Sequence, residues 1–108
     1  MMKIDTTTLT DIINKCFANA TDGRFTAEQR AVFLADGKRL RGLLLNLLSA
    51  QFNAGTPQLV AANAQLQTVN ADLKASVASI AQAQATLNNV AQLVGTLDGL
   101  LGVAASFV

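Results

Sequence analysis

The sequence lacks histidine, tryptophan and tyrosine, and it holds one cysteine, Cys16, and one proline, Pro57. Histidine is the most common general base and metal ligand in proteins, so its absence removes the usual basis of both kinds of site. A single cysteine can neither close an internal disulfide nor complete a zinc site. Neither a phosphate-binding loop motif nor a dinucleotide-binding fingerprint occurs. We therefore expect no enzymatic activity, no metal site, no cofactor and no small-molecule substrate.

Charged residues are few and unevenly placed. They make up 14% of the chain, compared with roughly 25% in an ordinary soluble domain. Seven of the eight basic residues lie between Lys3 and Arg41, and from residue 51 onward the only charges are Asp72, Lys74 and Asp98. A long helix in water usually carries more charge on its outer face. We therefore expect the second half of the chain to be covered by protein or by lipid.

The net charge of +1 favours no particular partner through bulk electrostatics. Lys38, Arg39 and Arg41 form a small basic cluster, but without tryptophan or tyrosine the chain offers no platform for stacking bases, so we expect no nucleic-acid binding. The first residues, 1–6, contain no apolar run typical of a Sec signal peptide. A cytoplasmic location is the default expectation, while export by a dedicated route and membrane association both stay open.

The pattern of apolar residues predicts helices. Alternating β-branched runs, which are typical of strands, are absent, so the predicted fold class is all-α. Apolar residues at helical spacing predict a first helix over about 8–20, with Thr8 as its N-cap. Cys16 lies on the apolar side of this helix. We interpret it as a small buried side chain, because a nucleophile there would have no obvious base.

A second helix is predicted to start at Thr26 and to reach Phe52. Gln29 lies three residues after Thr26, and the two residue types fit a capping box at the start of a helix. Asp36 and Gly37 either divide this segment into two helices or lie inside one bent helix, because no proline forces a break.

Gly55, Thr56 and Pro57 mark the clearest boundary in the sequence. Glycine suits the end of a helix, threonine suits an N-cap, and proline suits the first helical position. From Pro57 to Ala104 we predict a single helix, because apolar residues recur every seven positions and are followed three positions later by mostly small residues. This pattern predicts a coiled-coil-like seam. The seven-residue series is Leu59, Leu66, Leu73, Ile80, Leu87, Val94 and Leu101, followed by Ala62, Val69, Ser76, Ala83, Val90, Leu97 and Ala104.

A continuous helix over 57–104 would be long for a chain of 108 residues. It would span about 70 Å at 1.5 Å per residue, whereas a compact domain of this size has a radius of gyration of about 13 Å. The first half of the chain is too short to cover the whole seam. Three solutions stay open: the helix folds back near 88–99, it pairs with itself or another helical protein, or its end enters a membrane.

The C-terminal segment 90–108 holds one charge, Asp98, and the glycine pair Gly95 and Gly99. About 20 apolar residues can span a bilayer, and this glycine spacing lets two helices approach closely in lipid. The alternative is a buried terminal helix. The basic, leucine-rich stretch over 38–52 likewise either lies on an anionic membrane surface or forms a core helix with its cations on the solvated side.

Alanine also recurs every seven positions on another side of the predicted long helix. Because alanine is the best helix former, an exposed face explains it without any partner. The alternative is a second packing side in a multi-helix assembly. The residues concerned are Ala64, Ala71, Ala78 and Ala85.

The predicted architecture is a single helical domain over 1–108, of the helical-bundle or coiled-coil type. Two short N-terminal helices within 1–55 pack on one long heptad-patterned helix that occupies 56–108 together with the apolar tail. The leading functional hypothesis is a non-catalytic assembly or interaction protein that contacts itself or another helical protein through the seam. The residues expected to carry this contact are Leu59, Leu66, Val69, Leu73, Ile80, Leu87, Val90, Val94, Leu97 and Leu101.

The alternative hypothesis is a membrane-active helical protein, such as a small subunit of a pore-forming or membrane-remodelling assembly, which inserts its apolar C-terminal segment. Gly95 and Gly99, together with Lys38, Arg39 and Arg41, would then contact lipid or allow close packing of helices. A third hypothesis is a small adaptor whose apolar groove is filled by one partner protein.

Overall fold

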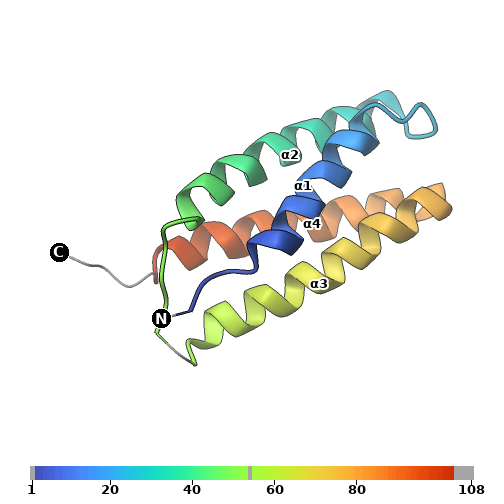
Figure 1. Ribbon diagram of the computed structural model, residues 1–108. Coiled ribbons are helices and arrows are strands. Elements are labelled where there is room, and N and C mark those ends of the chain that lie inside the picture. Colours follow the sequence, from blue (N-terminus) through green and yellow to red (C-terminus); the bar gives the residue numbers. More distant parts are fainter. Residues whose placement is uncertain (1, 54, 104–108) are drawn as a thin grey trace.

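The computed structural model describes residues 2–53 and 55–103, and this part of the chain is all-α (Figure 1). Met2 and Phe52 form an isolated antiparallel backbone pair outside the helices. The helices are α1 (Thr6–Ala20), α2 (Ala27–Leu47), α3 (Pro57–Ala78) and α4 (Ala83–Leu101), with one 3₁₀ turn, η1 (Ile80–Gln82), between the last two. The predicted fold class is thus confirmed.

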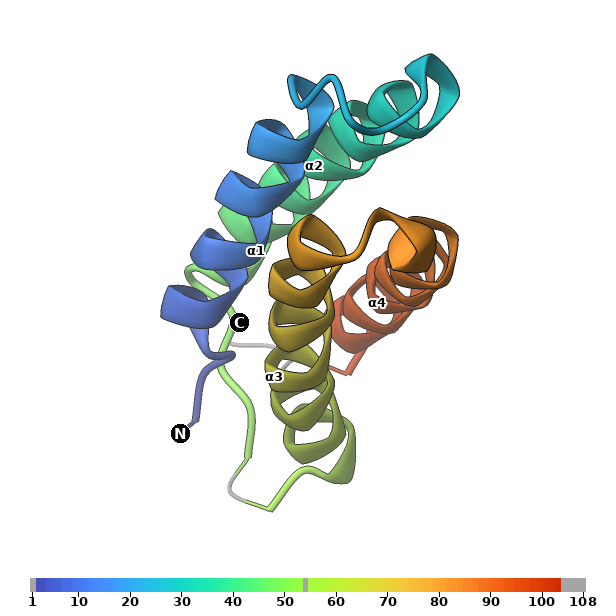
Figure 2. The ribbon, with the colours of Figure 1, turned by 90° about the vertical axis from the view of Figure 1, so that its right-hand side faces the viewer.

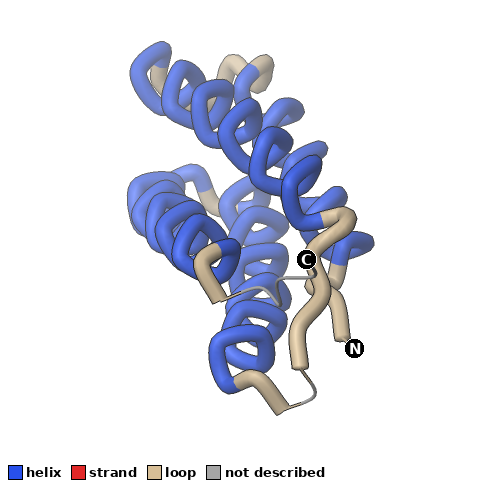
Figure 3. The backbone as a smooth tube through the Cα atoms, turned by 90° about the vertical axis from the view of Figure 1, so that its left-hand side faces the viewer, coloured by secondary structure: helices blue, strands red, loops and turns tan. Residues whose placement is uncertain are grey.

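The helices form two antiparallel hairpins that pack on each other. α1 pairs with α2 and α3 pairs with α4, and the hairpins stack so that α1 contacts α3 and α2 contacts α4 (Figures 1 and 2). The connection from α2 to α3, described over residues 48–53 and 55–56, therefore links diagonally opposite helices at one end of the bundle, beside the N-terminal segment (Figure 3). The described part measures 47 × 20 × 19 Å along its principal axes.

Local hydrogen bonds set the starts of the first two helices. α1 begins earlier than predicted, because Asp5 and not Thr8 is its N-cap: the Asp5 carboxylate accepts from the Thr8 backbone N–H at 3.1 Å and from the Thr8 hydroxyl at 2.7 Å. The capping box of α2 is confirmed. Thr26 Oγ1 accepts from the Gln29 backbone N–H, and Gln29 Oε1 accepts from the Thr26 N–H, both at 3.1 Å.

α2 is one helix that passes through Asp36 and Gly37 without interruption and ends at Leu47, so its predicted extension to Phe52 is wrong. A glycine fits at position 37 because α1 crosses close by. A Cβ atom there would lie 3.1 Å from Phe17 Cε1 and 3.3 Å from Cys16 Cβ. The glycine in the middle of α2 therefore serves helix packing and not a chain break.

The boundary before α3 is as predicted in position. Gly55 adopts a left-handed conformation with φ of 79°, which glycine tolerates without steric cost. Pro57 occupies the start of α3, and Thr56 is its N-cap residue, although its side chain does not cap the helix. The Thr56 hydroxyl instead donates to the Asn53 carbonyl at 2.6 Å.

The prediction of one continuous helix over 57–104 is wrong. α3 ends at Ala78, Ser79 is extended with φ −139° and ψ 98°, and the chain reverses through η1 into α4. The chain therefore does fold back, but at 79–82 and not at 88–99. Neither glycine nor proline marks the break. The heptad spacing continues across it because α3 and α4 turn their apolar sides toward the same core, and Ala104 lies outside the described residues.

The core runs the length of the bundle and draws on all four helices. Phe25 and Phe33 pack edge to face near the 21–26 turn, with ring centroids 5.1 Å apart. At the opposite end, Phe52 is fully buried and its backbone pairs with Met2. Aromatic side chains thus close both ends of a core that is otherwise mainly aliphatic.

Candidate functional site

The residues of the predicted association seam lie inside the chain's own core. The four helices bury most of them completely or nearly so, while Ile80 and Leu101 are half-buried. α4 buries a wider face than the heptad series describes, because it contacts both α2 and α3. Thr86, Leu93 and Leu100 are therefore also buried. The seam residues that are buried are Leu59, Leu66, Val69, Leu73, Leu87, Val90, Val94 and Leu97.

Polar side chains on one side of α3 join the two hairpins. Asn63 Oδ1 accepts from the Asp5 backbone N–H at 2.8 Å, and Asn70 Oδ1 accepts from Lys15 Nζ at 2.8 Å. Between them, the Gln67 amide donates to the Thr8 hydroxyl at 3.0 Å. The face of α3 that packs against α1 therefore carries uncharged polar residues, because their amides form hydrogen bonds with the first hairpin.

The C-terminal hairpin uses one of its three charges internally. Asp72 accepts from the Asn89 amide at 2.8 Å, which ties α3 to α4. Lys74 and Asp98 remain exposed. The outer surface of α3 and α4 therefore consists mainly of alanine, glycine, glutamine, asparagine and threonine.

Gly95 and Gly99 lie on this outer surface and are exposed. A Cβ atom added at either position would meet no other atom within 4 Å. Within residues 2–53 and 55–103, the pair is thus not used for close packing. The regularly spaced alanines Ala64, Ala71, Ala78 and Ala85 are exposed as well.

Three of the four basic residues of α2 are exposed, while Arg30 is half-buried. Lys38, Arg39 and Arg41 are exposed, and the Arg41 guanidinium lies 5.6 Å from the centroid of the Phe17 ring. Asp36 is half-buried one turn earlier. Burial raises the pKa of its carboxyl group, and the positive charge of Arg39 partly offsets that increase.

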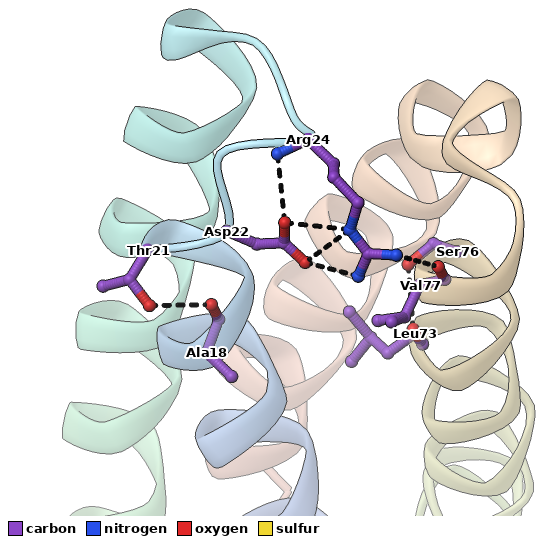
Figure 4. Close-up of polar contacts among 7 residues, drawn as sticks. All are labelled: Ala18, Thr21, Asp22, Arg24, Leu73, Ser76 and Val77. Atoms are coloured by element: carbon purple, nitrogen blue, oxygen red, sulfur yellow. Dashed lines mark hydrogen bonds and ion pairs between the residues drawn. The ribbon is translucent and has the colours of Figure 1, made fainter.

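A salt bridge holds the turn between α1 and α2 (Figure 4). The Arg24 guanidinium donates to the Asp22 carboxylate, with a shortest distance of 2.6 Å. These hydrogen bonds lower the pKa of Asp22 to about 2. Arg24 Nη1 also donates to the Val77 carbonyl at 3.1 Å, in the last turn of α3. A side chain of the first hairpin thus donates a hydrogen bond to a backbone carbonyl at the end of α3, just before the chain reverses.

Among the described residues, one buried thiol and one open groove were considered as possible sites. Cys16 is fully buried, and this burial, with the nearby Asp36, raises the pKa of its thiol to about 12. An open groove of about 430 Å³ lies between the starts of α2 and α4, beside Val32 and Leu87. Of the described residues that line it, Glu28 is the charged one. Within residues 2–53 and 55–103, no group of three or more Cys, Asp or Glu side chains could hold a metal ion.

The segment 90–108 was considered above as a possible membrane span. Its first part lies in α4, and its last part lies outside the described residues. In α4, Val90, Val94 and Leu97 face the bundle interior. None of the helices in the described part is both long enough and apolar enough to cross a bilayer. Residues 104–108, the end of the proposed span, lie outside that part.

Comparison with known proteins gives no relative: no family model, no curated protein and no solved structure matches this chain.

Proposed function

We propose that this protein is a non-catalytic helical association protein, and that the outer face of the α3–α4 hairpin carries the contact. The observation that carries this proposal is the scarcity of charge on that face, where Lys74 and Asp98 are the exposed charges of two helices. Depletion of charged residues is typical of the central part of a protein–protein interface.

Two exposed glycines of α4 also favour this face as the contact surface. Glycine inside a helix costs about 1 kcal/mol relative to alanine. In the described part of the chain, no neighbouring atom lies close enough to require glycine at Gly95 or Gly99. A helix of a second molecule that packed across α4 would give these positions a use, because the missing side chains would let the two backbones approach.

The contact proposed here lies outside the seam residues, which the chain covers with its own helices. A second copy of the chain is the simplest occupant, since its hairpin offers an equally uncharged face and paired copies need no complementary charges. Another helical protein with a small-residue face would fit the same surface.

Sedimentation equilibrium over a range of concentrations tests the proposal. We expect wild type to self-associate, and expect the double variant Gly95→Leu/Gly99→Leu to weaken association by about tenfold or more, because two bulky side chains separate the helices. Gly42→Leu is the matched control: Gly42 is also exposed on a helix, and a Cβ there meets no atom within 4 Å.

Circular dichroism would show that all variants keep their helices. A wild-type protein that stays monomeric at every concentration would contradict self-association. An equal loss in the Gly42→Leu control would contradict the assignment of the contact to α4.

A further inference from the structure

One end of the bundle exposes several large apolar side chains. It is the end at which α1 and α3 begin and α2 and α4 finish (Figures 1 and 3). Leu45 is 64% exposed and Val60 is 57% exposed. Among the described residues, Val32, Leu34 and Val77 are the exposed large apolar residues nearer the other end. We call the set Met2, Leu45, Leu48, Val60 and Val103 the apolar end.

Cations accompany this apolar end on the outer face of α2. Lys38, Arg41, Leu45 and Leu48 follow one another at spacings of three, four and three residues, and all are exposed. Such spacing places them along one side of a helix. Arg41 lies about 10 Å behind Leu48 along the helix axis at 1.5 Å per residue. Lys3 also lies at this end, where its ammonium group donates to the Leu48 carbonyl at 3.1 Å.

Carboxylates at this end lie on other helices. Asp5 is engaged as the N-cap of α1, Asp11 is exposed on α1, and Asp98 is exposed on α4. From residue 37 to residue 48, α2 and its C-cap carry three cations and no acid. The α2 edge of the apolar end therefore combines exposed leucines with positive charge.

We propose that the apolar end docks on the surface of an anionic phospholipid bilayer, with its α2 edge nearest the lipid. Amphipathic surfaces of this kind bury their apolar side chains about 5–10 Å into the boundary between headgroups and acyl chains. With Leu45 and Leu48 at that depth, Arg41 lies near the level of the headgroup phosphates. Lys38 lies one turn farther from the lipid, and its long side chain can extend toward the phosphates. This docking requires no helix that crosses the bilayer.

The absence of tryptophan and tyrosine allows a direct test. Leu48→Trp places one fluorophore at the apolar end, and Val77→Trp places one at an exposed position at the other end of the bundle. With vesicles of phosphatidylcholine and phosphatidylserine, we expect the emission of the Leu48→Trp protein to shift to the blue and to be quenched by brominated lipid. The Val77→Trp protein should show neither change.

Vesicle co-sedimentation would separate the apolar and the charged contributions. We expect Leu45→Ser/Leu48→Ser to reduce partitioning by about tenfold or more, and Lys38→Ala/Arg41→Ala to reduce it on the order of tenfold on anionic vesicles. Val32→Ser/Leu34→Ser is the matched control, with two exposed apolar residues of α2 replaced nearer the other end, and should leave partitioning unchanged.

Three outcomes would overturn the proposal. One is no response of the Leu48→Trp protein to anionic vesicles. Another is an equal response to vesicles of phosphatidylcholine alone, because the cations would then have no role. The last is a blue shift that depends on protein concentration without vesicles, since a second copy would then cover this end. The Gly95→Leu/Gly99→Leu variant should still bind vesicles, so failure of one proposal is distinguishable from failure of the other.

Discussion

The two hairpins of the bundle differ in what fixes the ends of their helices. In the N-terminal hairpin, α1 is capped by Asp5 and α2 by the reciprocal pair Thr26 and Gln29. In the C-terminal hairpin, neither α3 nor α4 has a side-chain hydrogen bond at its N-cap. Arg24, which satisfies a carbonyl near the end of α3, comes from the other hairpin. The first hairpin is therefore specified locally, and the second depends more on packing.

The strongest test of this contrast removes packing from the C-terminal hairpin. Leu66 is fully buried in α3, so Leu66→Ala should lower the free energy of unfolding by about 2–5 kcal/mol through lost burial and a cavity. The measurement is urea denaturation followed by circular dichroism. Val60→Ala is the control on the same helix, where the side chain is exposed and the loss should be about 0.5 kcal/mol or less. A small effect at Leu66 would mean that this side chain is not covered within one chain.

Removing a cap from the N-terminal hairpin should have a smaller effect. Asp5→Ala should lower the free energy of unfolding by about 0.5–2 kcal/mol, as is typical for the loss of an N-cap. Hydrogen bonds from the Thr8 side chain and backbone hold the pKa of Asp5 below its ordinary value of 3.8. The stabilisation is therefore fully present above that pH and is lost as the pH falls through the lower pKa of the folded state.

Denaturation at pH 7 and at acid pH would check both parts of that prediction. The difference in stability between wild type and Asp5→Ala should shrink on acidification. A difference that stays constant would show that the charged carboxylate is not the group that stabilises α1.

The smallest effects concern four helical glycines. Gly42→Ala, Gly95→Ala and Gly99→Ala should each raise the free energy of unfolding of the monomer by about 0.5–1 kcal/mol, because alanine is the better helix former and no atom obstructs its Cβ. Gly37→Ala should show no such gain, since its Cβ would press on Phe17 and Cys16. Thermal unfolding of the four variants at a concentration where the chain is monomeric would compare them directly. An equal gain at Gly37 would contradict the close approach of α1 and α2.

The same contrast explains which parts of the fold the sequence could predict. The capping box at Thr26 and the start of α3 at Pro57 are signals carried by a few neighbouring residues, and both predictions are confirmed. Gly55 does not end the second helix, because α2 already ends at Leu47. The start of α1 was misplaced because Asp5 and Thr8 are both good N-cap residues, and only the geometry shows which side chain accepts the hydrogen bond.

The break at Ser79 could not be read locally, because neither glycine nor proline occurs there and the heptad spacing runs through it. The spacing predicted an apolar seam. Whether the seam is covered by the same chain or by another molecule depends on where the chain reverses. Tertiary packing decides that point: a hairpin buries both halves of the seam in one molecule. The recurrent alanines were explained in the sequence by an exposed face, and the structure confirms that Ala64, Ala71, Ala78 and Ala85 are exposed. Which helices share that face depends on where the chain reverses.

The diagonal connection between α2 and α3 has a consequence for the order of folding. Contacts within each hairpin join residues that are close in the sequence, whereas contacts between the hairpins join residues that are far apart. Within each hairpin, partners are joined by a short turn, so each pair of helices can find its register by local search. The hydrogen bonds between α1 and α3 instead join residues 55 to 62 positions apart. Assembly is therefore expected in two stages, with hairpins closing first and docking second. The amides of Asn63, Gln67 and Asn70 would then form their hydrogen bonds at the docking stage. They would favour the parallel alignment of α1 with α3 over other alignments that apolar contacts alone would allow.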